Sequence, residues 1–555
     1  MQALVASLES ADGTPPRHVQ THISHVLLHG GHAYKIKKAL ANPFLDQSTL
    51  ARRRAACADE LRLNRRLAPD LYLDVQPITG TPDAPRLGGS GPLLEVAVRM
   101  RAFDEAGLWD RLAARGELGA SDIDELAARL AGLHEAAAAA PADGRLGTPQ
   151  QVRPLLLDSL HDLRDGATDA AERATLDALA AWEQTAFPRL APELARRLAA
   201  GRVREGHGDL HLGNVAREQG RCLVFDGIEF NAELRWLDVM SDLAFMVMDL
   251  HAHGLPALAH RCVDAYLQAS GDYDGLRVFD YFVVHRALVR AKVARLRAAQ
   301  AAGDAMGKPP TPGTPGTPAT PGTAEAPDPA DAADLAAAQA AVQHYLQLAL
   351  RFTHPRRRAL LVTHGLSGSG KTTFTQHLLE EAGAVRVRAD VERKRLAGLA
   401  AAQPSGSAPG AGLYDAAANA ATYERLFDAA RAVLDGGWPV ILDATFLRRS
   451  DRQAARRCAA QQGVPFAILH FEAAPALLRE RLRRRAAQGH DASEADAAVL
   501  DLQQRTAEPL AADELDAVHD VNTASGAPSG AELAALLARL GLAAPQAARP
   551  AQLDR

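Results

Sequence analysis

The hydrophobic pattern at the start of the chain predicts a β-hairpin followed by a helix. Two β-like runs, residues 22–28 and 32–38, flank the turn-forming pair Gly30 and Gly31. An arginine-rich helical pattern follows over residues 48–67. We therefore expect a small β-containing lobe at this end of the chain.

The pattern after Ala102 is mostly helical. One β-rich stretch interrupts it at residues 205–230, and apolar residues at helical spacing continue over residues 334–352. A small β-containing lobe followed by a large helical lobe is thus expected before residue 353.

From Ala359 onward, strands and helices alternate along the sequence. Each of four β-like runs is followed by a helical pattern, and these runs are residues 359–364, 385–390, 439–445 and 466–471. Such alternation predicts a parallel sheet with helical crossovers.

Proline-rich and glycine-rich segments divide the chain. Residues 303–329 carry repeated proline and glycine, which remove hydrogen-bond donors and add backbone entropy, so a disordered insert is expected there. A shorter loop-like insert spans residues 403–412. The sequence predicts one domain over residues 1–353, a second over 354–542, and a disordered tail over 543–555.

Composition narrows the function classes. The chain has 555 residues and a formal net charge of −5, which argues against a general nucleic-acid or membrane binder. The N-terminus lacks a signal-peptide pattern, and no apolar run reaches the roughly 20 residues of a membrane helix. Four scattered cysteines fit reduced thiols. A cytoplasmic protein without a membrane or nucleic-acid partner is expected.

A phosphate-binding motif follows the first strand of the alternating region. The segment from Gly365 to Thr372 fits G-x-x-x-x-G-K-[ST], with an apolar strand before it and a helix after it. Backbone N–H groups of such a loop surround phosphates, the lysine reaches the β- and γ-phosphates, and the threonine hydroxyl binds Mg²⁺. The predicted ATP-binding residues here are Gly365, Gly368, Gly370, Lys371, Thr372 and Thr373.

Two carboxylates end the neighbouring strand patterns. Asp443 closes an apolar run and is a candidate Mg²⁺ ligand together with Thr372, although it could instead orient the acceptor or cap the next helix. Asp390 ends the run 385–390 and is a candidate base for the attacking hydroxyl, or else a surface cap.

The run from Arg479 to Arg485 is strongly basic. On a lid, its arginines would neutralise charge on the transferred phosphoryl group, and Arg481 and Arg484 are the candidates; a solvated helix face is the alternative. The basic run, the P-loop and the Asp390-x-x-Arg393 spacing carry a resemblance between residues 356–540 and P-loop small-molecule or polynucleotide kinases. The resemblance implies that Asp390 is the base and that Arg393 contacts the acceptor or its phosphate.

The β-rich stretch 205–230 carries a second candidate phosphotransfer site. It reads H-x-D-x-x-x-x-N around Asp209 and Asn214, and Asp226 follows at the end of a hydrophobic strand. This spacing can place one carboxylate at an acceptor hydroxyl, and a second carboxylate with an amide on Mg²⁺. Asp238 and Asp242, which follow the site, are expected to anchor the loop.

These motifs resemble those of aminoglycoside phosphotransferases, whose fold is related to protein kinases. The resemblance implies that Asp209 is catalytic and that Asn214 and Asp226 bind Mg²⁺. It also implies a lysine on a strand that pairs with the ATP phosphates, oriented by Glu60. Lys35 is the favoured candidate for this role and Lys37 is the alternative, because residues two apart share one strand face.

The whole chain resembles a bacterial two-part family in which such a kinase-like domain precedes a P-loop domain. We therefore expect an α+β protein-kinase-like (aminoglycoside phosphotransferase-like) domain followed by an α/β P-loop domain. The leading hypothesis is a bifunctional kinase that uses ATP and Mg²⁺ to phosphorylate hydroxyl groups of small molecules at two sites. The alternatives are a regulatory ATP-binding protein and, for the P-loop domain, a nucleic-acid 5′-hydroxyl kinase.

Overall fold

The computed structural model describes residues 1–12, 15–42, 45–307, 329–408, 411–488, 492–523 and 526–542. The chain forms two compact units, one made of Met1–Gly147, Arg197–Arg277 and Arg356–Arg555, the other of Thr148–Arg196 and Val278–Pro355. Within the first unit we call the segments before Arg277 the kinase-like part and the segment after Arg356 the P-loop part. Most of the predicted disordered insert (308–328) and the tail (543–555) lie outside the described residues, and the predicted domain division stays a prediction.

An antiparallel sheet forms the first layer of the kinase-like part. Its strand order is β1-β2-β3-β8-β6-β7, with β1 Arg17–Gln20, β2 Ser24–His29, β3 His32–Lys37, β6 Tyr72–Thr81, β7 Ala84–Leu87 and β8 Leu93–Arg101. The hairpin predicted around Gly30 and Gly31 is confirmed, since both glycines have positive φ and His29 pairs with His32. Strands β6, β7 and β8 were not expected from the sequence.

Helices cover both faces of this sheet. Leu4 and Leu8 of α1 (Gln2–Asp12) pack with Leu27 and Ile36 on one face. On the other face, Cys57 of α2 (Leu50–Asn64) packs with Val96 and Val98. Because successive strand side chains point to opposite faces, Lys35 and Lys37 lie on the α2 side, opposite Ile36.

The remainder of the kinase-like part is helical with short hairpins. Its helices are α3 Trp109–Ala114, α4 Ala120–Ala136, α7 Ala232–Arg235, α8 Val239–Ala252 and α9 Pro256–Ser270. The short strands are β4 Ala41–Asn42, β5 Leu45–Asp46, β9 Val203–Glu205, β10 Val215–Glu218, β11 Arg221–Val224 and β12 Trp236–Asp238. The β-rich stretch predicted over residues 205–230 is thus confirmed by the β10–β11 hairpin, and the β9–β12 pair flanks it.

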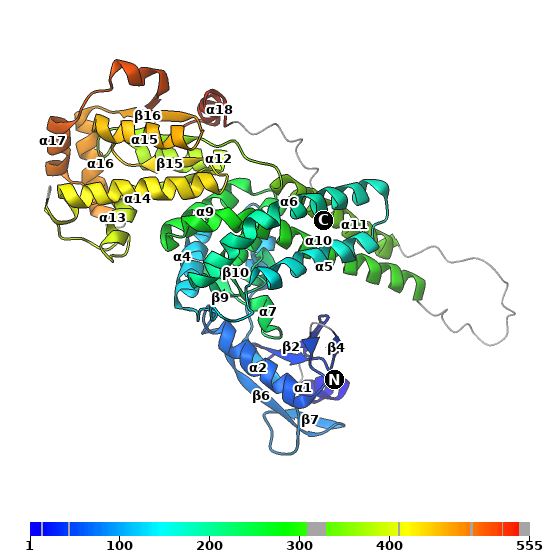
Figure 1. Ribbon diagram of the computed structural model, residues 1–555. Coiled ribbons are helices and arrows are strands. Elements are labelled where there is room, and N and C mark those ends of the chain that lie inside the picture. Colours follow the sequence, from blue (N-terminus) through cyan, green and yellow to red (C-terminus); the bar gives the residue numbers. More distant parts are fainter. Residues whose placement is uncertain are drawn as a thin grey trace. The chain divides into compact units, whose positions relative to one another are not determined.

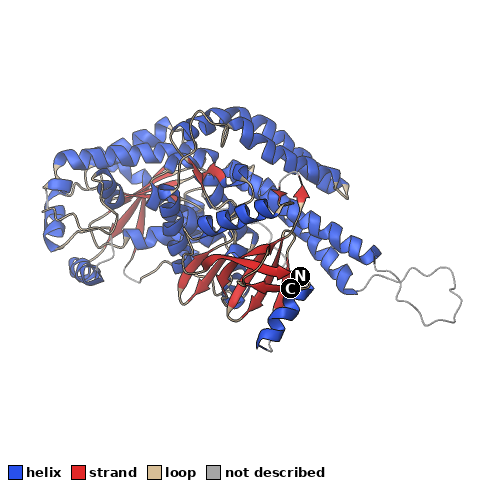
Figure 2. Ribbon diagram, turned by 90° about the horizontal axis from the view of Figure 1, so that it is seen from below, coloured by secondary structure: helices blue, strands red, loops and turns tan. Residues whose placement is uncertain are grey.

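The second compact unit is helical (Figure 2). It holds α5 Pro149–Asp165, α11 Pro329–Phe352, and most of α6 Ala170–Ala199 and α10 Leu276–Gly307. Arg153 of α5 pairs with the buried Glu183 of α6 at 2.9 Å. Helix α11 confirms the helical pattern predicted over residues 334–352.

The P-loop part is built on a five-stranded parallel sheet (Figure 1). The order is β14-β15-β13-β16-β17, with β13 Leu360–His364, β14 Val385–Arg388, β15 Val440–Asp443, β16 Phe466–Glu472 and β17 Val518–Asn522. Its helices are α12 Lys371–Ala382, α13 Ala389–Leu396, α14 Ala416–Asp435, α15 Arg449–Gln461, α16 Pro475–Gln488, α17 Ala497–Thr506 and α18 Gly530–Arg539. Both predicted fold classes are confirmed, although β17 was not expected.

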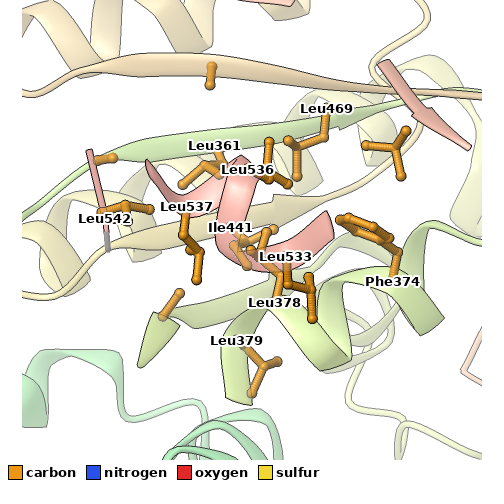
Figure 3. Close-up of a cluster of buried hydrophobic side chains, with 14 of the residues drawn as sticks. Leu361, Phe374, Leu378, Leu379, Ile441, Leu469, Leu533, Leu536, Leu537 and Leu542 are labelled. Atoms are coloured by element: carbon orange, nitrogen blue, oxygen red, sulfur yellow. The ribbon is translucent and has the colours of Figure 1, made fainter. Parts of the chain in front are cut away.

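One buried apolar cluster fixes the helix that carries the P-loop lysine (Figure 3). Leu378 and Leu379 of α12 pack with the sheet residues Leu361, Ile441 and Leu469, and leucines of α18 complete the cluster. Burial of each of these leucines contributes roughly 2 kcal/mol, so the apolar cluster holds α12 firmly against the sheet.

None of the described helices is long and apolar enough to cross a membrane.

Candidate active sites

The P-loop backbone leaves no room for side chains at its glycines. Gly365, Gly368 and Gly370 have φ of +149°, +84° and +91°. A Cβ atom on Gly365 would lie 2.5 Å from the Phe471 carbonyl oxygen, and one on Gly368 would lie 3.0 Å from that of Leu478. The loop therefore needs glycine at these positions to present backbone N–H groups at the start of α12.

Lys371 is a buried cation. Its ammonium donates to the carbonyl oxygens of Gly365 at 2.9 Å and Leu366 at 2.8 Å, and the described residues place no carboxylate within ion-pairing distance. Burial lowers the pKa of Lys371 to about 8, against the opposing effect of Asp443 and Asp390. A buried ammonium without a carboxylate partner suits an anionic ligand such as a phosphate.

Thr372 and Asp443 supply a hard-oxygen pair beside this lysine. The Thr372 hydroxyl donates to Asp443 Oδ2 at 2.8 Å, and Asp443 is the last residue of β15, as predicted. Hydroxyl and carboxylate oxygens are the donors that Mg²⁺ prefers. The residues present thus fit Mg²⁺, which would neutralise phosphate charge when bound.

The predicted strand position of Asp390 is wrong. β14 ends at Arg388, because the chain turns there into α13, and Asp390 lies in the first turn of that helix. Asp390 nevertheless lines the same cavity as Lys371 and Asp443. It pairs with Arg393 at 2.9 Å, one helical turn later.

Arg393 is held in a fixed position. Its guanidinium also donates to Asn419 Oδ1 at 2.9 Å and lies 5.0 Å from the centre of the Tyr414 ring. Arg393 is buried and lines the cavity, as an acceptor-contacting residue must. Asn419 and Tyr414 were not predicted, since they belong to a segment without a recognisable motif.

The basic run from Arg479 to Arg485 lies on α16, and its members differ. Arg481 donates to the carbonyl oxygen of Thr523 at 2.7 Å and to that of Gly368 at 3.4 Å, so it braces the P-loop. Arg484 is exposed and lines the cavity, whereas Arg479 pairs with Asp501 on the surface. The lid role of Arg484 stays a prediction.

These residues surround one cavity of about 840 Å³. Five of the predicted ATP-binding residues line it, namely Gly368, Gly370, Lys371, Thr372 and Thr373. Residues from distant segments complete the lining, among them Tyr414, Asn419, Glu494 and Gln503. The cavity is large enough for a nucleotide and a small acceptor.

The candidate site of the kinase-like part is built around Glu60 of α2. One carboxylate oxygen of Glu60 accepts from Lys35 at 2.9 Å, and the other pairs with Lys37 at 2.5 Å. Lys35 also contacts Asp226, whereas Lys37 contacts the buried Glu229. The two lysines hold the pKa of Glu60 at about 2 although burial alone would raise it.

Only one of the two lysines borders open space. Lys35 and Asp226 line a cavity of about 720 Å³ between the sheet and Phe225, and Lys37 is not part of that lining. The side chain of Lys37 is 0% exposed. This geometry favours Lys35 as the phosphate-pairing lysine and makes Lys37 a structural cation.

Asp226 stands at a strained backbone position after β11. Its φ is +62°, its N–H donates to the Tyr72 hydroxyl at 3.0 Å, and the next N–H donates to Asn64 Oδ1 at 2.8 Å. A left-handed non-glycine residue costs energy, and tertiary contacts of this kind hold it. They aim Asp226 at Lys35.

Asp209 and Asn214 lie together on the loop before β10. Asn214 Nδ2 donates to the backbone oxygen of Asp209 at 2.8 Å and to its Oδ2 at 3.1 Å. The Asn214 carbonyl accepts from the N–H of Phe225 at 3.1 Å, which brings this loop beside Asp226. Asp209 and Asn214 are outside the lining of the Lys35 cavity.

Asp242 of α8 anchors this loop, as expected. It accepts from the N–H groups of His207 at 2.7 Å and Gly208 at 2.8 Å, and from His134 at 3.2 Å. These donors keep the pKa of Asp242 well below its ordinary value despite burial. The same expectation for Asp238 is wrong, because Asp238 pairs with the buried Arg197 at 2.6 Å.

Replacing Lys37 by methionine is expected to destabilise the fold. The change leaves Glu229 and Glu60 short of a buried cation, which costs about 3–5 kcal/mol. Urea titration of the free energy of unfolding measures it, with Lys38→Met as control, because Lys38 donates to an exposed carbonyl of Thr21. Equal stability of the two variants would contradict the structural role of Lys37.

Nucleotide binding at the P-loop is expected to weaken above pH 8. The pKa of Lys371 is lowered to about 8 from 10.5, so above that pH the free protein must take up a proton to bind phosphate. Affinity then falls by up to about tenfold per pH unit. The unfolded chain binds this proton more tightly, so the same group makes unfolding harder as pH rises from about 8 to 10.5.

Calorimetry of an Asp226→Ala variant between pH 7 and 9.5, in two buffers of different ionisation enthalpy, measures both affinity and proton uptake. Asp226→Ala removes the other site from the titration. A constant affinity without proton uptake would show that Lys371 keeps an ordinary pKa.

Comparisons with known proteins cover both parts of the chain. Residues 360–510 match the family described as "AAA domain". Uncharacterized proteins of Mycobacterium tuberculosis and Mycobacterium bovis are 28% identical over 492 residues, which is 87% of this chain and 89% of theirs. Residues 360–510, which the family model matches, contain the P-loop, Asp390, Asp443 and α16. This part of the chain is therefore a P-loop nucleotide-binding domain.

Solved structures give weaker similarities. A gluconokinase from Sinorhizobium meliloti 1021 is 24% identical, over 34% of this chain and 95% of that chain, with a TM-score of 0.23. A choline/ethanolamine kinase family protein from Mesorhizobium loti is 13% identical, over 62% of this chain and 97% of that chain, with a TM-score of 0.33.

Proposed function

We propose that the protein is a bifunctional kinase that transfers the γ-phosphate of ATP to hydroxyl groups of small molecules at two sites. The observation that carries this proposal is the P-loop cavity, where the Thr372–Asp443 pair, the buried Lys371 and the Asp390 carboxylate line one space. A nucleotide switch needs only Lys371 and the Thr372–Asp443 pair. A carboxylate placed to accept the acceptor's proton supports transfer.

At the P-loop site, each residue has a distinct task. Lys371 and the loop N–H groups bind the phosphates, and Thr372 and Asp443 would hold Mg²⁺, which supplies charge neutralisation when bound. Asp390 accepts the proton of the acceptor hydroxyl, and Arg393 orients the acceptor. Arg484 screens the charge of the transferred group.

The kinase-like part has the same division of labour. Lys35, fixed by Glu60, pairs with the phosphates, while Asp226 and Asn214 would hold Mg²⁺. Asp209 is the base. The loop that carries it is held by Asp242, so base and metal ligands keep their spacing.

The test is ATP turnover by the purified full chain against sugars, aminoglycosides, nucleosides and 5′-hydroxyl oligonucleotides. The proposal expects acceptor-dependent ADP release with at least one small hydroxyl compound. Turnover with oligonucleotides alone would assign the P-loop site to nucleic-acid ends. Tight ATP binding without any acceptor-dependent turnover would favour the regulatory alternative.

A further inference from the structure

Helix α9 of the kinase-like part contacts the P-loop part at the edge strand of the parallel sheet. β14 is the first strand in the sheet order, so one of its edges has no strand partner. Asp264 of α9 accepts the backbone N–H of Arg386 at this edge, at 2.7 Å. A buried edge N–H needs such a partner, and here a carboxylate supplies it.

The side chain of Arg386 continues this contact toward the phosphate site. Arg386 is 4% exposed, and its Nη1 donates to the carbonyl oxygen of Thr372 at 2.8 Å. Its Nη2 donates to Gln376 Oε1 at 2.7 Å and lies 3.6 Å from Asp264 Oδ2. The guanidinium therefore donates hydrogen bonds to the first two turns of α12, and a carboxylate from α9 lies close to it and neutralises its charge.

This series of contacts ends at Thr372, which is a proposed Mg²⁺ ligand. The Thr372 carbonyl is held by Arg386, and the Thr372 hydroxyl donates to Asp443. Gln268, one turn further along α9, donates to Asp264 at 2.5 Å and fixes its carboxylate. Partners that orient a ligand from behind tune metal binding strongly.

We propose that Asp264 and Arg386 form a positioning pair through which α9 holds Thr372 in the geometry that Mg²⁺ binding requires. The P-loop site is then complete only with a residue from the kinase-like part. The inference rests on the proposed function, because it takes Thr372 and Asp443 as the Mg²⁺ ligands.

The test compares Asp264→Asn with Arg261→Gln, both in an Asp226→Ala parent that leaves the P-loop site for measurement. Arg261 lies on the same helix and pairs with Glu380 of α12 at 2.6 Å, but it does not contact Thr372. The Mg²⁺ concentration is varied, and the binding of a fluorescent ATP analogue is measured at each concentration. Asp264→Asn is expected to raise the Mg²⁺ concentration for half-maximal binding by about tenfold.

A positioning role and a purely structural one give different results. Positioning predicts that Mg²⁺-free nucleotide affinity is unchanged in Asp264→Asn and that Arg261→Gln resembles the parent. An equal Mg²⁺ requirement in both variants would overturn the proposal, as would a loss of affinity that is the same with and without Mg²⁺.

Arg386→Lys decides the matter if Asp264→Asn does not fold. Lysine keeps a cation opposite Asp264 but cannot donate to both Thr372 and Gln376 of α12 as the guanidinium does. The same rise in the Mg²⁺ concentration for half-maximal binding is therefore expected. An unchanged Mg²⁺ requirement would refute the positioning role of the pair. If the parent binds no nucleotide, the proposed function of the P-loop site fails and the inference fails with it. If the parent binds and no variant shifts the Mg²⁺ requirement, only the inference fails.

Discussion

Replacing Asp390 by asparagine is expected to lower phosphotransfer at the P-loop site by about 10²-fold or more, with Mg²⁺-nucleotide binding preserved. Asp390 lines the cavity and pairs with Arg393, whereas Lys371 and Thr372 are the proposed nucleotide-binding residues. Asparagine fills the same space but cannot accept a proton. Arg393 also keeps its contacts with Asn419 and Tyr414, so the acceptor side stays formed.

The measurement is single-turnover transfer from radiolabelled ATP to an acceptor found by screening. Asp501→Asn is the matched control, because Asp501 forms an exposed pair with Arg479 and is not among the residues that line the cavity. Its rate should equal that of the wild type. If Asp390→Asn also keeps the wild-type rate, Asp390 is not the base.

The second large effect is expected at Asp209. Asp209→Asn should reduce transfer from the kinase-like part by about 10²–10⁴-fold while nucleotide still binds. The substituted amide can retain an oxygen toward Asn214 Nδ2, so the loop is expected to keep its shape. Asp226→Ala should show the opposite pattern, with Mg²⁺-nucleotide binding itself lost, because a proposed metal ligand is removed.

Binding and transfer are measured separately in a Lys371→Ala background, which removes the P-loop site. If Asp209→Asn retains turnover in this background, Asp209 is not the base. If Asp226→Ala retains full nucleotide affinity, Asp226 is not a metal ligand.

The sequence predicted those features that short segments encode. The P-loop, the Asp443 strand end and the Asp209–Asn214 loop each depend on neighbouring residues, and the structure places them as expected. Strand β6 was missed because polar, proline and glycine residues interrupt its alternation, and β17 because its sequence VHDVN has only two apolar residues. Asp390 was assigned to a strand because the alternating pattern over residues 385–390 gives no sign of where the helix begins.

Residues that meet through tertiary contacts could not be predicted. Lys35 and Lys37 share a strand face, and what distinguishes them is their partners Asp226 and Glu229 together with the cavity that Lys35 lines and Lys37 does not. Asp264 and Arg386 are 122 positions apart in the sequence, and no local pattern links them. Tyr414, Asn419 and Glu494 likewise reach the cavity from segments without a motif.

The central claim is that one chain carries two separate Mg²⁺-nucleotide sites. Isothermal titration calorimetry with a non-hydrolysable ATP analogue and Mg²⁺ counts them directly. The account predicts about two sites in the wild type, one each in Lys371→Ala and Asp226→Ala, and none in the double variant. A single site in the wild type, lost completely in either single variant, would contradict it.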